Sequence, residues 1–119
     1  DQMSYGRQNS GEPYKRITVH EALEMQNKGA LIVDVRRDDE WTEGHPTNAI
    51  HIEVDNVLSE ADDNLPKDKD LLFICAAGVR SGLAAEMAAA LGFNQEKLFN
   101  VEQGVPVWIA ENLPTTYGN

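Results

Sequence analysis

Cys75 is the chain's only cysteine, and its surroundings suit nucleophilic chemistry. It ends the apolar run of residues 71–75 and is followed by the small residues Ala76, Ala77 and Gly78. A loop of small residues between a strand and a helix can turn its backbone N–H groups inward, and the helix dipole adds positive charge at the same place. Such surroundings bind anions and lower the pKa of a thiol. The pattern predicts a reactive thiolate at Cys75, although a lone cysteine is by composition more typical of a small buried apolar residue.

Two polar residues close the same loop. Arg80 is its one basic side chain and could pair with an anionic substrate or with a sulfur anion, a role that we favour over that of a surface arginine. Ser81 suits an N-cap of the following helix whose hydroxyl also faces the sulfur. Gly78 is expected at positive φ, because a loop that turns its amides inward usually needs one residue without a Cβ.

Composition excludes several classes of site. One cysteine and three histidines are too few for an internal disulfide or for a zinc site of Cys and His ligands, so we predict no metal and no cofactor. Ten basic against twenty acidic residues give a net charge of −10, which repels phosphates and anionic lipid surfaces. No apolar run approaches the roughly 20 residues that span a bilayer. We therefore expect neither nucleic acid nor a membrane as a partner.

Helix and strand patterns alternate along the chain. Thr18 and Glu21 form a capping box that opens a helix through about residue 28. Asp38 or Asp39 is expected to cap a short helix within residues 36–44. The apolar runs that predict strands are residues 31–35, 49–52, 71–75 and 98–101, and the further helices are predicted at residues 81–91 and 105–111. The alternation predicts an α/β domain with a mainly parallel sheet and helices on both faces.

The 119 residues fit one domain. Residues 1–15 are polar and lack a periodic apolar pattern, so we expect a flexible N-terminal tail followed by a single domain of residues 16–119. The chain shows no apolar signal region, and we expect a cytoplasmic protein, with a processed periplasmic or organellar form as the alternative.

The loop resembles the active-site loop of the single-domain rhodanese family, which runs Cys-x-x-Gly-x-Arg-Ser. The matching residues are Cys75, Gly78, Arg80 and Ser81. Weaker motifs follow in the family's order over about residues 16–113, namely Asp34-Val35-Arg36, Glu40-Trp41, Gly44-His45, Ala49-Ile50, Ala84 through Leu91 to Gly92, and Gly104 with Trp108. The resemblance implies a three-layer rhodanese-like fold, a five-stranded mainly parallel sheet flanked by helices on both faces.

The resemblance also implies a sulfurtransferase that works through a persulfide on Cys75. Thiosulfate, a polysulfide or a persulfide would donate sulfane sulfur, and cyanide, a thiol or a protein acceptor would take it. The protein itself is expected to be a monomer or a weak dimer. Cys75 and Arg80 are the predicted catalytic residues. The predicted substrate-binding residues are Ala76, Ala77, Gly78, Val79, Ser81 and Arg36.

Other residues of the motifs are interpreted as structural. For Asp34, Arg36 and Glu40 we favour an arginine–carboxylate pair that ties the strand end to the next helix, with Arg36 also a candidate to line the pocket. His45 is expected to make a hydrogen bond that fixes its loop, since persulfide transfer from a thiolate needs no general base. Trp41 and Trp108 are expected to pack in the core or at its rim.

The sequence leaves three alternative interpretations open. A phosphatase or arsenate reductase on the same fold would carry five residues between Cys and Arg, whereas residues 76–79 provide four. A non-catalytic rhodanese module that binds a partner would commonly lack the cysteine. An unreactive, purely structural Cys75 would show an ordinary thiol pKa.

Overall fold

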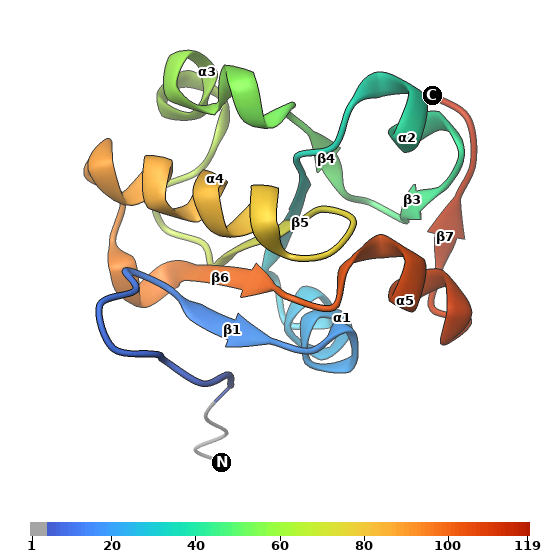
Figure 1. Ribbon diagram of the computed structural model, residues 1–119, viewed down its shortest axis with the longest axis horizontal. Coiled ribbons are helices and arrows are strands. Elements are labelled where there is room, and N and C mark those ends of the chain that lie inside the picture. Colours follow the sequence, from blue (N-terminus) through green and yellow to red (C-terminus); the bar gives the residue numbers. More distant parts are fainter. Residues whose placement is uncertain (1–4) are drawn as a thin grey trace.

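The computed structural model describes residues 5–119, in which one parallel sheet lies between two layers of helices (Figure 1). The strands are β1 (Lys15–Ile17), β2 (Leu31–Asp34), β3 (His45–Pro46), β4 (Ile50–His51), β5 (Leu71–Ile74), β6 (Leu98–Val101) and β7 (Thr115–Thr116). The helices are α1 (Val19–Asn27), α2 (Asp38–Thr42), α3 (Val57–Asn64), α4 (Val79–Ala90) and α5 (Gly104–Ala110), with short 3-10 turns η1 (Val54–Asn56) and η2 (Gln95–Lys97).

The main sheet has the strand order β1-β6-β5-β2-β4, and all neighbouring strands in it are parallel. The predicted fold class is confirmed. Strand β5 lies at the centre and pairs with both β2 and β6, so that Ile74 stands opposite Asp34 on one side and Val101 on the other. Because the strands are parallel, their carboxyl ends meet at one edge of the sheet. Cys75 follows β5 at that edge.

The alternation of side chains along β5 divides the interior into two cores. Leu71 and Phe73 pack with α3 and α4 on one face, and Leu72 and Ile74 pack with α1 and α5 on the other. All four side chains are fully or almost fully buried. A strand buried on both faces needs a continuous apolar sequence, which is the pattern that predicted it. Trp108 of α5 is fully buried, as expected.

Two helix caps test the sequence rules in opposite ways. The capping box of α1 is confirmed, because the Thr18 hydroxyl accepts from the Glu21 N–H at 3.1 Å and the Glu21 carboxylate accepts from the Thr18 N–H at 2.9 Å. The prediction that Asp38 or Asp39 caps α2 is wrong. The N-cap residue is Arg37, whose N–H donates to the Glu40 carboxylate at 3.1 Å, and both aspartates lie in the first turn, where negative charge suits the helix dipole.

The segment before residue 16 contributes to the fold. Tyr14 is 3% exposed and belongs to one core, Lys15 begins β1, and Arg7 forms an antiparallel bridge with Arg16. The expectation of a flexible tail through residue 15 is therefore wrong for Tyr14, which is part of the core, and for Lys15, which is part of the sheet. Strand β1 escaped prediction because it is three residues long and starts with two charged side chains. For residues 1–4 the expected tail lies outside the described residues.

Strands β3 and β7 form a separate two-stranded antiparallel sheet near the C-terminus, which the sequence patterns did not predict. Each strand has only two residues, too few to show a periodic pattern. Within residues 5–119, none of the helices combines the length and the apolar character that crossing a membrane requires.

The turn between β6 and α5 packs tightly against the loop that carries Cys75. Gly104 has φ +85°, and a Cβ at this position would overlap the carbonyl oxygen of Ala76 and lie 2.9 Å from that of Cys75. The next residue, Val105, donates its N–H to the Cys75 carbonyl at 2.8 Å. Only glycine allows this approach, so the turn fixes the position of the loop.

We predict that Gly104→Ala lowers the free energy of unfolding much more than Gly92→Ala, measured by urea denaturation. Gly92 also has a positive φ of +98°, but a Cβ at this position would have no atom within 4 Å, so its substitution carries the backbone strain alone, about 1–2 kcal/mol. Gly104→Ala adds overlap with backbone atoms, a further ~1–3 kcal/mol. Equal losses for the two variants would contradict the close approach.

Candidate active site

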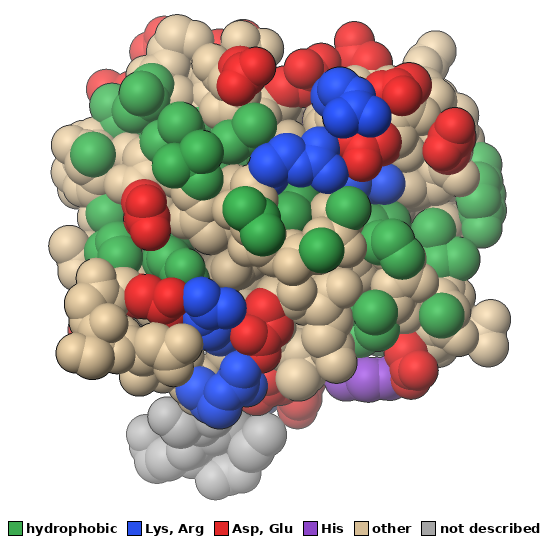
Figure 2. Space-filling model, viewed as in Figure 1, with side chains coloured by type: hydrophobic (Ala, Val, Ile, Leu, Met, Phe, Trp, Pro, Cys, Tyr) green, Lys and Arg blue, Asp and Glu red, His purple; other side chains and the backbone are tan. Residues whose placement is uncertain are grey.

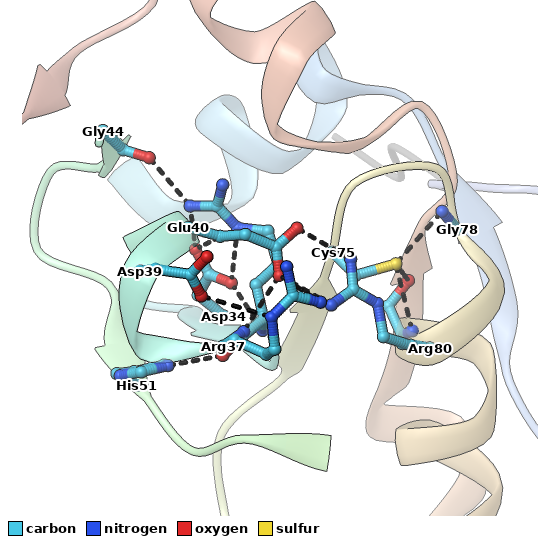
Figure 3. Close-up of polar contacts among 11 residues, drawn as sticks. Asp34, Arg37, Asp39, Glu40, Gly44, His51, Cys75, Gly78 and Arg80 are labelled. Carbon is cyan, nitrogen blue, oxygen red and sulfur yellow. Dashed lines mark hydrogen bonds and ion pairs between the residues drawn. The ribbon is translucent and has the colours of Figure 1, made fainter. Parts of the chain in front are cut away.

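The sulfur of Cys75 is buried and is held by hydrogen bonds from its own loop (Figure 3). The N–H groups of Gly78 and Ser81 donate to the sulfur at 3.2 and 3.3 Å. The Ser81 hydroxyl oxygen lies 3.2 Å from it. These contacts bring together three of the predicted site residues, and the two N–H groups point inward as expected.

Gly78 gives the loop its shape. Its φ is +92°, as expected, and it is the N-cap residue of α4. A Cβ at Gly78 would lie 2.7 Å from the carbonyl oxygen of Glu102, so this glycine is needed for its conformation and for its close packing. The prediction that Ser81 caps the helix is wrong. Helix α4 begins at Val79, two residues earlier than predicted, and Ser81 lies inside its first turn with its side chain toward the sulfur.

Burial and hydrogen bonding act in opposite directions on Cys75. Burial raises the pKa of the thiol, whereas hydrogen bonds from the Ser81 hydroxyl and from the backbone N–H groups of Ser81, Ala77 and Gly78 lower it. The net effect is a pKa below its ordinary value. The loop therefore favours the thiolate, which is the nucleophilic form of cysteine.

Asn100 of β6 competes for the proton of the Ser81 hydroxyl. Asn100 is fully buried, and its Nδ2 donates to the Gly78 carbonyl at 3.0 Å, which turns its Oδ1 toward Ser81. The Ser81 hydroxyl donates to Oδ1 at 2.6 Å. A hydroxyl has one proton, so it serves either Asn100 or the sulfur, while the backbone N–H groups always donate. Sequence reasoning missed Asn100, although a polar residue inside an apolar strand was a visible signal.

Arg80 extends from α4 toward α2 and pairs with Glu40 (Figure 3). Its two terminal nitrogens donate to the two carboxylate oxygens at 2.8 and 3.0 Å, a bidentate pair. The hydrogen bonds from Arg80 lower the pKa of Glu40 to about 2, against the opposing effect of burial. The pKa of Arg80 is raised, first by Glu40 and further by the nearby charges of Cys75 and Asp34. Glu40 thus contacts a predicted catalytic residue.

Arg36 forms the buried arginine–carboxylate pair that the sequence predicted, and its partner is Asp34. The Arg36 Nη2 donates to Asp34 Oδ2 at 2.8 Å and to the Gly44 carbonyl at 2.7 Å, and the Asp34 carboxylate also accepts the Arg36 N–H at 3.0 Å. The two side chains are 7% and 0% exposed. The pair ties the end of β2 to the turn after α2. With these donors engaged, the place of Arg36 in substrate binding stays a prediction.

Helix α2 is held by a stack of three rings. Trp41 lies parallel to His45, with ring centroids 3.4 Å apart, and to His51, with centroids 4.7 Å apart. His45 Nδ1 lies 2.8 Å from the Trp41 carbonyl, which confirms the expected loop-fixing hydrogen bond. His51 Nε2 lies 2.6 Å from the Arg36 carbonyl. The stack fixes α2, and with it Glu40, relative to the end of β2.

One group among the described residues has potential metal ligands close together. Asp38, His51 and Glu53 offer ligand atoms within 4.8 Å of one another. His51 is engaged at both ring nitrogens, however, since Nε2 faces a backbone carbonyl and Nδ1 lies 3.6 Å from Asp38. We interpret this group as polar side chains that contact one another and the backbone.

The remaining predicted residues line the rim of the loop. Val79 is 80% exposed at the start of α4. A groove of about 370 Å³ runs beside the loop, and Ala77, Gly78 and Val79 form one of its walls. The other lining residues come from the N-terminal segment and from α4, namely Glu12, Tyr14, Arg16, Gly82, Leu83 and Glu86. Ala76 lies against Gly104 through its carbonyl group.

Known proteins resemble this chain over most of its length. Residues 18–111 match the family model described as Rhodanese-like domain. The thiosulfate sulfurtransferase GlpE of Haemophilus influenzae is 30% identical over 107 residues, which cover 88% of this chain and 99% of that protein. The thiosulfate sulfurtransferase GlpE of Pseudomonas putida is 33% identical over 98 residues, or 82% of this chain and 86% of that protein.

Solved structures show the same fold. A rhodanese-related protein from Thermoplasma volcanium superposes with a TM-score of 0.74 at 31% identity, covering 87% of this chain and 98% of that one. The rhodanese-like domain of the Alr3790 protein from Anabaena superposes with a TM-score of 0.75 at 23% identity, covering 89% and 80%. The second similarity concerns the fold alone.

We predict that Ser81→Ala raises the pKa of Cys75 and leaves a thiolate that still forms readily, because the backbone N–H donors remain. Ultraviolet titration of the thiolate measures this directly, since Cys75 is the only cysteine. Ser59→Ala, at an exposed position on α3, is the control and should leave the titration unchanged. An unchanged or lower pKa in Ser81→Ala would show that the hydroxyl proton stays with Asn100.

We predict that Arg36→Ala lowers the free energy of unfolding by about 3–5 kcal/mol, because it leaves the Asp34 carboxylate buried without its partner. Arg37→Ala, which removes the neighbouring arginine with a 64% exposed side chain, should cost less than about 1 kcal/mol. Urea denaturation of both variants gives the two values. A loss below ~1 kcal/mol for Arg36→Ala would contradict a structural role for the pair.

Proposed function

The chain belongs to the rhodanese-like domain family, and on this basis we propose that it is a sulfurtransferase that carries sulfane sulfur as a persulfide on Cys75. Two relatives that cover most of its length are named thiosulfate sulfurtransferases. The observation that carries the proposal is the buried Cys75 sulfur, which accepts hydrogen bonds from the N–H groups of Gly78 and Ser81 at the start of α4. Such a cradle stabilises a sulfur anion.

The proposed reaction has two transfer steps. In the first, the Cys75 thiolate attacks the outer sulfur of a donor, a sulfur–sulfur bond to Cys75 forms, and the bond between the outer sulfur and the rest of the donor breaks. The electron pair of the broken bond leaves with that remainder, as sulfite from thiosulfate or as a thiolate from a persulfide. In the second step an acceptor takes the outer sulfur, and Cys75 regains its electron pair as a thiolate.

The residues of the loop support both steps. The N–H groups lower the pKa of Cys75 and so favour the thiolate, which is the nucleophile of the first step. They stabilise the thiolate again when the sulfur departs in the second step. The side chains of Ala76 and Ala77, next to Cys75 in the loop, are small. Arg80 adds a positive charge, which acts on Cys75 through space and is shared with Glu40.

The proposed partners are small molecules. Thiosulfate, polysulfides or persulfides serve as donors, and cyanide or thiols serve as acceptors. A protein acceptor would carry a basic surface, because the net charge of this chain is −10.

A phosphatase or arsenate reductase receives less support from the site. Such an enzyme needs an arginine that faces the same anion as the loop N–H groups, at the end of a loop with five intervening residues. Here four residues separate Cys75 from Arg80, and the Arg80 guanidinium is bound to Glu40.

We predict that intact-protein mass spectrometry detects the gain of one sulfur atom after treatment with thiosulfate or a polysulfide, and that cyanide removes it. Cys75→Ser should gain no sulfur, since the chain has no other cysteine. The same variant controls for sulfur bound without a covalent bond. Failure of every donor to load the wild-type protein would exclude the proposed reaction.

A further inference from the structure

We infer that Glu40 determines which sulfur donors the site accepts, by binding Arg80 so that persulfides with little charge are favoured over the dianion thiosulfate. The inference rests on the proposed function and specifies its substrate class. Glu40 lies on α2 and Arg80 on α4, and their side chains reach each other near Cys75 (Figure 3).

The pair occupies Arg80 in the way that an anionic donor would. Both terminal nitrogens of Arg80 donate to the two oxygens of Glu40, at 2.8 and 3.0 Å. This bidentate geometry is also how a guanidinium binds an oxyanion such as the sulfonate end of thiosulfate. The two side chains are only 29% and 20% exposed, so water screens the pair incompletely. An oxyanion that binds Arg80 in this way must displace Glu40.

The carboxylate stays charged throughout the pH range in which the protein would work. Hydrogen bonds from Arg80 hold the pKa of Glu40 at about 2, although burial acts in the opposite direction. The Arg37 N–H also donates to Glu40, at 3.1 Å. Protonation therefore does not release Arg80.

The other arginines near the site are also matched by carboxylates. Arg36 is bound to buried Asp34, and Arg37 pairs with Asp39 at 3.2 Å and lies 3.6 Å from Glu40. On the face shown in Figure 2, basic side chains lie against acidic ones and do not gather into a separate basic patch. Among residues 5–119, a dianion that approaches the Cys75 thiolate thus meets like charge, and the neighbouring arginines already have carboxylate partners.

A persulfide avoids this problem. The Cys75 thiolate attacks the outer sulfur of R–S–SH. A bond forms between the Cys75 sulfur and the outer sulfur, the sulfur–sulfur bond of the donor breaks, and R–S⁻ leaves with the electron pair. The proton stays on the outer sulfur. The protonated persulfide reacts with one negative charge from start to finish and an ionised persulfide would bring two, whereas attack on thiosulfate brings three negative charges together.

The test compares two donors in wild-type protein and in Glu40→Gln. The donors are thiosulfate and the persulfide of 2-mercaptoethanol, whose hydroxyethyl group carries no charge. The readout is the rate of sulfur loading on Cys75, measured by rapid quench and mass spectrometry. Glutamine keeps the one oxygen that accepts from the Arg37 N–H and from Arg80 Nη1, but it loses the negative charge and the second acceptor, so the bidentate ion pair with Arg80 is lost. We expect thiosulfate loading to rise by about tenfold or more, and persulfide loading to change by less than about threefold.

Asp39→Asn is the matched control, because it removes one negative charge from the same helix turn without touching Arg80. Asp39 is 69% exposed and pairs with Arg37. Glu40→Ala frees Arg80 in a second way and replaces Glu40→Gln if that variant unfolds. An equal gain in Asp39→Asn, or a thiosulfate rate that stays constant or falls in the Glu40 variants, would overturn the inference. If wild-type protein takes sulfur from neither donor, the proposed function itself fails.

Discussion

The buried sulfur of Cys75 is satisfied by the backbone of its own loop, and the rest of the site depends on this constraint. The inward N–H groups require Gly78 at positive φ, with its backbone packed against Glu102. They also require a neighbour without a side chain at Gly104, whose turn contacts the carbonyl groups of the loop. Backbone donors cannot rotate away, so they hold an anion without the entropy cost of ordering long side chains.

The charged side chains around the loop then act mainly on one another. Asp34 neutralises Arg36 in the interior, and Glu40 neutralises Arg80 at the rim. Both pairs begin in the segment from the end of β2 through α2, which the ring stack of Trp41 fixes in place. Because each of these two positive charges has a fixed partner, we infer that the electrostatics of the site favour sulfur donors that bring little charge of their own.

Much of the fold follows from local patterns. The continuous apolar run of β5 predicts a central strand, and the Thr18 and Glu21 capping box predicts the start of α1. The alternation of such strands with helices is enough for an α/β domain with a parallel sheet. The failures are short or weakly patterned elements. Three residues of β1 and the cap of α2 carry too little local signal, because contacts with the rest of the fold decide them.

The sequence alone determined the contacts that lie within one loop. Cys75, Gly78 and Ser81 are within seven residues, so a strand end, a glycine and a helix start bring them together in any fold that keeps that order. Only the tertiary structure decided that Glu40 binds Arg80, 40 residues away, and that Asn100 of β6 competes for the Ser81 hydroxyl. Those partners meet because parallel strands carry distant segments to one sheet edge, and no local pattern specifies which side chains face each other there.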